Sequence, residues 1–133
     1  MHKVIEYVKT KLETCVVPEF PGTTIYTYAP QAMKYERPFI GIQYKGHTNS
    51  TIMRTIGRVP IEHTIDLVIG AKETSPSSSE DWFVSVISKV KDCFRPWVIE
   101  NDLMPISTTS MVEDDNYSRL KDSATITIRI LEI

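Results

Sequence analysis

Histidine and tyrosine are the residue types in this 133-residue chain best suited to acid–base chemistry. We expect His47 to lie in a turn and His63 within the apolar alternation of a strand. Because buried polar groups normally find hydrogen-bond partners, the pattern favours a satisfied structural ring for His63 over a catalytic or metal-binding role. The alternative is a small catalytic or ligand-binding domain whose cleft joins His63 to Tyr26, Tyr28 and Tyr44.

The other groups that suggest chemistry lack the spacing that it requires. The acidic run 113–116, which contains Asp114 and Asp115, has neither the central glycine nor the distal glutamate of an EF-hand loop, and so indicates a solvated turn. The five glycines do not form a phosphate-binding loop, and the serines between 75 and 79 lack a nucleophile elbow. The sequence therefore predicts no catalytic residue, no cofactor and no bound metal.

The two cysteines, Cys15 and Cys93, belong to no CxxC pair and to no histidine cluster with the spacing of a zinc site. Free cysteine behaves as a small apolar residue that is often buried, so we expect two buried, reduced thiols. A disulfide between them is the alternative.

Composition and charge limit the classes of function open to the chain. With 41% hydrophobic and 24% charged residues it has the composition of a globular protein, and 133 residues suit a single domain. The net charge of -2 comes from scattered acids and bases, so no basic stripe supports dedicated binding to nucleic acid. The amino-terminal segment lacks the apolar run of a signal peptide, and no segment has the length of a membrane span, which predicts a soluble cytoplasmic protein.

The spacing of apolar residues predicts two amphipathic helices and a mainly antiparallel sheet. Val4 and Val8 lie on the apolar stripe of the first helix, and Trp82 and Val86 lie on that of the second. We expect helices at 2–14 and from about 79 to 95, and strands at 24–28, 39–44, 59–70, 106–112 and 123–133.

Two local signals mark the ends of these elements. Gly46 and Asn49 predict a turn after the strand at 39–44. Ser77 and Glu80 have the spacing of a capping box, which predicts the start of the second helix.

The order of the elements predicts an α+β domain with both helices packed on one face of the sheet, because short connections favour antiparallel neighbours. The opposite face can meet water or a partner, and a dimeric adaptor that uses it is one function that fits. By alternation this face carries polar and β-branched side chains, namely Thr64, Asp66, Thr125, Thr127 and Arg129.

The last predicted strand offers a route to assembly. It has high β propensity and no proline, and its apolar end at Leu131 and Ile133 would have no following chain to cover it. Unless it is central or covered, such a strand is a hazardous edge, which a ring of like subunits in head-to-tail contact would protect. In the connection after the second helix, Trp97 either packs back on the sheet or marks an interface. Arg54 and Arg58 flank a glycine in a segment whose apolar spacing fits neither a helix nor a strand.

The order, length and patterning of these elements, with a terminal strand that ends in ATITIRILEI, resemble the small tail-terminator and tail-completion proteins of long-tailed bacteriophages. The resemblance implies a hexameric ring that caps the tail tube and joins it to the head connector, without enzymatic activity. The partners would be other copies of the chain, the tail-tube protein and connector proteins, and DNA would only pass through the lumen. The protein would lie in the neck of the virion tail, and in the host cytoplasm during assembly. Under this hypothesis the candidates for interface contacts are Arg54, Arg58, Asp114, Asp115, Arg129 and Ile133.

Overall fold

The computed structural model describes residues 2–27, 38–49, 60–70, 76–113 and 123–133. Five strands and two α-helices confirm the predicted α+β class. In chain order the elements are α1 (His2–Lys11), a π-helical turn η1 (Leu12–Val16), β1 (Thr24–Tyr26), β2 (Phe39–Asn49), β3 (Ile61–Gly70), α2 (Pro76–Cys93), β4 (Leu103–Glu113) and β5 (Ser123–Glu132).

The five strands form one sheet in the order β1-β2-β3-β5-β4. Antiparallel pairing holds for β2 with β3, β3 with β5, and β5 with β4, as predicted. At one edge, however, β1 pairs with β2 in parallel over three residues. The connection 27–38 is long enough for the crossover that parallel strands need, so the general expectation of antiparallel neighbours is wrong there.

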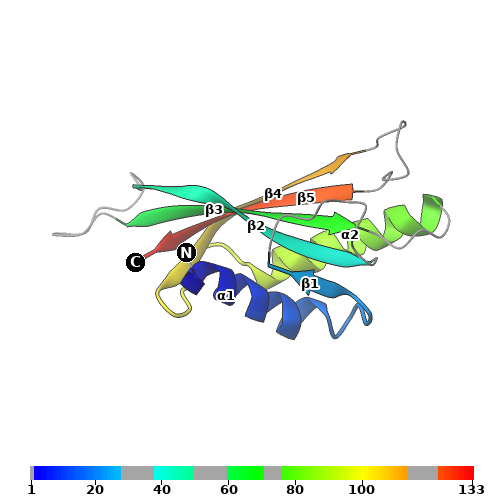
Figure 1. Ribbon diagram of the computed structural model, residues 1–133, viewed down its shortest axis with the longest axis horizontal. Coiled ribbons are helices and arrows are strands. Elements are labelled where there is room, and N and C mark those ends of the chain that lie inside the picture. The colour runs from blue at the N-terminus through cyan, green and yellow to red at the C-terminus, as the bar shows by residue number, and fades with distance from the viewer. Residues whose placement is uncertain (1, 28–37, 50–59, 71–75, 114–122) are drawn as a thin grey trace.

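Both helices lie on the same side of the twisted sheet (Figure 1). The apolar stripes of α1 and α2 pack on the inward side chains of the central strands, and full burial of one such aliphatic side chain contributes roughly 1.5–3 kcal/mol. The core contains Val4, Val8, Leu12, Ile40, Ile42, Ile65, Leu67, Ile69, Val86, Val90, Phe94, Ile126, Ile128 and Ile130.

Strand β2 continues through the predicted turn. Gly46, His47 and Asn49 all lie in the strand, opposite β3, so the expectation of a turn there is wrong. The register shifts between Tyr44 and Gly46, and Gly46 has a φ of 136° that a side chain would resist. A β-bulge therefore absorbs the extra residue and lets the strand continue.

Two other boundaries differ from the expectations. Helix α2 begins at Pro76 and not near 79, so Ser77 lies inside the helix and the capping-box prediction is wrong. Proline suits the first position of a helix, where its missing N–H would have no intrahelical partner. Strand β4 begins at Leu103 and not at 106, because Asn101 and Asp102 adopt φ values of 51° and 63° and form a tight turn. Positive φ at both central residues is the geometry of a type I′ hairpin turn.

Strand β5 lies between β3 and β4, so the last strand is central and forms no edge. The expectation that its apolar end is uncovered is wrong for Leu131, which is fully buried in a small cluster with Met104 and Ile106. Within the described residues, the edges of the sheet are formed by β4 on one side and by β1 and the rest of β2 on the other.

Candidate functional site

A small pocket, with polar groups set in a mostly apolar wall, lies where β2, β3 and β5 meet on the helix side of the sheet. Tyr44, His47, Ile61, His63 and Glu132 line it, and its volume is about 340 Å³. Strand register brings these residues together, because His47 lies opposite His63 and Ile61 lies opposite Glu132. Side chains alternate along a strand, so His63 shares its face with the core residues that follow it in β3. The paired ends of β2 and β3 extend past the first turn of α1 (Figure 1), and the pocket opens at this end of the inner face.

Tyr44 stands between the two histidines. Its hydroxyl lies 2.7 Å from Nδ1 of His63 and 3.3 Å from Nδ1 of His47. On the other side of the His63 ring, Nε2 lies 3.4 Å from Oε1 of Glu132 but makes no hydrogen bond in the structure. The His63 side chain is only 5% exposed, so the prediction of a fully satisfied ring holds for one nitrogen and is wrong for the other.

Burial controls the protonation states in this pocket. It lowers the pKa of His63, although the Glu132 carboxylate opposes that change, and it raises the pKa of Tyr44, with a further contribution from Glu132. At neutral pH the His63 ring is therefore neutral, and its Nδ1 shares a hydrogen bond with the protonated Tyr44 hydroxyl. A tyrosine nucleophile or base requires the opposite change, a depressed pKa. The arrangement thus suits binding of a polar or aromatic group better than it suits catalysis.

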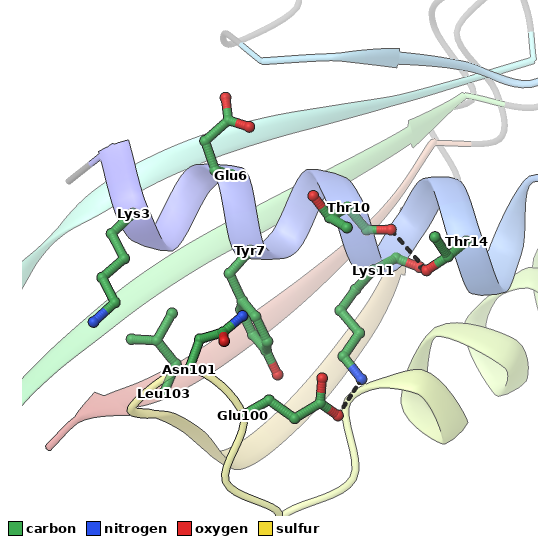
Figure 2. Close-up of a pocket in the computed structure, with 9 residues that line it drawn as sticks. All are labelled: Lys3, Glu6, Tyr7, Thr10, Lys11, Thr14, Glu100, Asn101 and Leu103. Carbon is green, nitrogen blue, oxygen red and sulfur yellow. Dashed lines mark hydrogen bonds and ion pairs between the residues drawn. The ribbon is translucent and has the colours of Figure 1, made fainter.

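A larger groove of about 440 Å³ separates α1 from the turn that begins β4. Figure 2 shows Lys3, Tyr7 and Lys11 reaching from α1 toward this turn, whereas Glu6 points away from it. The Lys11 ammonium donates to Glu100 at 2.5 Å.

The charged groups of this groove serve to fasten the helix to the turn. Besides the Lys11 contact, Lys3 pairs with Asp102 at 3.6 Å. Burial, with smaller contributions from Glu100 and Cys15, raises the pKa of Tyr7 to about 12, so its hydroxyl stays protonated. Since these groups already have partners or stay neutral, the groove has the character of a structural contact.

The two cysteines are free, as predicted, but they are half-buried and not fully buried. They line a shared pocket of about 180 Å³ beside α1 and α2. Burial first, and then the neighbouring Cys15, raises the pKa of the Cys93 thiol to about 12. A thiol with so little thiolate at neutral pH is chemically inert.

The predicted interface residues that the structure describes have mixed environments. Arg129 pairs with Glu62 on the open face of the sheet, and Ile133 is 37% exposed. Trp97 is 59% exposed, which favours the interface alternative over packing on the sheet. The remaining interface candidates (Arg54, Arg58, Asp114 and Asp115) lie outside the described residues, and so does Tyr28.

The tyrosine cleft of the alternative hypothesis forms only in part. Tyr44 and His63 meet as that hypothesis requires, but Tyr26 lies opposite Gly41 and packs edge-on against Phe39, with ring centroids 6.1 Å apart. Sequence reasoning missed His47 and Glu132 as members of the pocket. The signal for His47 was its alternation with Tyr44 across the bulge, which the glycine between them concealed.

Neither helix combines the length and apolar character needed to cross a membrane, as far as the described residues extend. In the same part of the chain, no three His, Cys, Asp or Glu side chains are grouped closely enough to hold a metal ion. A comparison with known protein families and with curated proteins finds no match to this chain.

Proposed function

We propose that this chain is a structural subunit that assembles with copies of itself into a ring, which ends the tail tube of a long-tailed bacteriophage and joins it to the head connector. One observation carries the proposal. Both helices cover a single face of the sheet, while no described helix or strand covers the opposite face or the outer sides of the edge strands, which can therefore contact other chains.

Beside the apolar cluster at Leu131, the open face carries polar side chains that contact one another across its strands. Arg129 donates to Glu62, and the Thr127 hydroxyl donates to Asp66 at 2.8 Å. These two contacts contain two carboxylates and one guanidinium, so this part of the face carries no excess of positive charge. A surface of this kind suits the lining of a lumen through which DNA must pass without adhering.

The sheet edges differ from one another, which suits head-to-tail contacts. One edge is β4, and the other is β1 with the adjoining part of β2. When a subunit joins unlike surfaces and the rotation between neighbours closes, the product is a ring. A head-to-tail ring therefore requires no self-complementary surface on the subunit.

The pocket at Tyr44 favours a second candidate function, a small ligand-binding domain. A volume of about 340 Å³, with a hydroxyl, an imidazole and a carboxylate on its walls, is at the low end of small-molecule sites. Calorimetric titration or crystallography with ligand mixtures would reveal such an activity in a monomeric protein.

Light scattering over a concentration series, followed by electron microscopy with tails assembled in the absence of this chain, tests the proposal. We expect discrete rings in solution, or rings that form at the ends of the tails. A protein that stays monomeric and leaves the tail ends bare would overturn the assembly function and leave the ligand-binding candidate.

A further inference from the structure

The outer edge of strand β4 is unpaired among the described residues and lacks the features that usually protect an edge strand. It pairs with β5 on one side only, and from Ile106 to Glu113 the described residues provide no partner for its other side. Proteins that stay monomeric usually protect such edges with charged residues, proline or bulges. The bulge of β4 lies at its beginning, near Pro105, and Ser107 to Val112 contain neither charge nor proline.

An exposed apolar loop lies beside the beginning of this edge. The backbone N–H of Trp97 donates to the carbonyl oxygen of Pro105 at 2.8 Å. The side chains of this loop lie in solvent, because Trp97, Val98 and Ile99 are 59%, 46% and 58% exposed. Trp97 also has a φ of 70°, a left-handed conformation that costs a bulky residue roughly 1–3 kcal/mol. The chain therefore holds a large aromatic side chain in water at a cost in backbone energy, and such strain is typical of functional contacts.

The opposite edge of the sheet provides a matching strand. Only Phe39, Ile40 and Gly41 of β2 pair with β1, so the outer side of Ile42–Asn49 has no strand partner among the described residues. Strands β2 and β5 both run antiparallel to β3, and β4 runs antiparallel to β5, so β4 and β2 point in opposite directions. Copies placed side by side would continue the sheet as one antiparallel series.

Antiparallel pairing also fixes which ends meet. The beginning of β4, where Trp97 lies, would face the end of β2 in the next copy, where His47 contributes to the pocket. Both features lie on the helix side of the sheet. Val98 lines a pocket with Tyr7 of α1, and His63 faces the same side as the core.

We propose, on the basis of the ring function above, that the edge of β4 pairs with Ile42–Asn49 of a second copy of this chain and that Trp97 inserts into the pocket at Tyr44 and His63 of that copy. The main-chain ladder supplies hydrogen bonds, and the indole supplies a desolvated anchor, a frequent role for tryptophan at interfaces. The indole N–H faces a pocket whose acceptors include the Glu132 carboxylate. One contact thus accounts for the strained Trp97 and for the open pocket at Tyr44 and His63.

Crosslinking tests the pairing of the edges. In a background with Cys15→Ser and Cys93→Ser, Thr109→Cys places a thiol on β4 and Lys45→Cys places one on β2, both at exposed positions. With a short bismaleimide, we expect covalent dimers in the mixture of the two variants and none in either variant alone. Dimers of the Thr109→Cys variant alone would show pairing of β4 with β4 and would overturn the proposal.

Substitution tests the anchor. Trp97→Ala should weaken self-association by about 30-fold, the size expected for an interface hot spot, and Trp97→Phe should restore part of it. Val84→Ala is the matched control, because Val84 is an equally exposed apolar residue, at 60%, on α2. Ile61→Phe, which adds volume inside the pocket, should weaken association as Trp97→Ala does. Sedimentation velocity measures association, and the melting temperature of each variant excludes misfolding.

The outcomes separate this interface from the ring function. If rings form but the two cysteine variants do not crosslink and Trp97→Ala does not weaken association, the proposed interface is overturned and the proposed function stands. Crosslinks in open chains that never close would support the interface and contradict the ring. A monomer that neither crosslinks nor binds tails would overturn both.

Discussion

The hydroxyl of Tyr44 lies 2.7 Å from Nδ1 of His63, across two strands whose register is interrupted by a bulge one residue away. This hydrogen bond satisfies one nitrogen of a histidine that is 4% exposed, whereas the other nitrogen has none. The Tyr44 hydroxyl is therefore the hydrogen-bond partner that the structure shows for this buried ring.

Removing that hydroxyl should destabilise the fold. In Tyr44→Phe the ring still packs, but Nδ1 of His63 becomes a second buried polar atom without a partner, at an expected cost of about 1–3 kcal/mol. Urea unfolding measures the loss. Thr48→Val, an exposed change on the same strand, should stay within about 0.5 kcal/mol of the parent protein. Equal stability of the two variants would show that the hydrogen bond contributes nothing.

The pKa of His63 makes stability depend on pH. Burial places its folded value below the ordinary 6.5, so the unfolded chain binds the proton more tightly than the folded chain does. The contribution of His63 to the free energy of unfolding is therefore complete above 6.5 and falls as the pH drops from 6.5 toward the folded pKa. An NMR titration of the imidazole gives the folded value directly, and His63→Gln should remove this part of the pH dependence. A folded pKa at or above 6.5 would mean that Glu132 outweighs burial.

The pocket shows which structural features the periodicity of the sequence can predict and which it cannot. Strands β3 and β5 have strict alternation, which predicted both strands and the polar character of the face that carries Arg129. The second half of β2 was missed because Gly46, which the bulge requires, has the appearance of a turn residue. Glu132 reaches the pocket only through the pairing of β5 with β3, and no local spacing reveals such a long-range register.

The boundaries depended on the same kind of long-range information. The start of β4 was missed because the Asn101-Asp102 turn lacks the glycine that most often marks a hairpin. The central position of β5 was equally hidden, since its β propensity is compatible with an edge or an interior strand. Tertiary pairing, which a single sequence does not contain, decided both.

The Cys93 thiol should react slowly in the folded protein. A pKa of about 12 leaves Cys93 with little thiolate at mildly alkaline pH, and the thiolate is the species that attacks aromatic disulfides. We expect slow labelling of Cys93 by Ellman's reagent in buffer and rapid labelling of Cys93 in urea. Ser88→Cys, which adds an exposed thiol to α2, provides the control and should label at once. Fast labelling of Cys93 in the folded protein would contradict its burial.

Gly70 has a packing requirement that arises from its neighbour. A Cβ at this position would lie 2.3 Å from Cε1 of Phe39, whose side chain is 1% exposed and lies directly opposite on β2. The ring has little room to move, so Gly70→Ala should cost about 1–3 kcal/mol, the usual penalty of overpacking. Combining it with Phe39→Leu should recover part of that cost, because the two substitutions share one contact. Chemical unfolding of the four proteins in the cycle measures the coupling, and strict additivity would contradict the clash.

The Arg129 pair on the open face should behave as a partly buried contact and not as a fully exposed one. Glu62 is 13% exposed and Arg129 is 43% exposed, so Arg129→Met would leave a carboxylate with little water and no partner. We expect a loss of about 1–2 kcal/mol, larger than the usual value for exposed pairs, because the remaining charge is poorly solvated. Adding Glu62→Gln should restore part of the stability by removing that charge. If the double variant were less stable than Arg129→Met alone, packing of the arginine stem on the strand would explain the loss better than its charge.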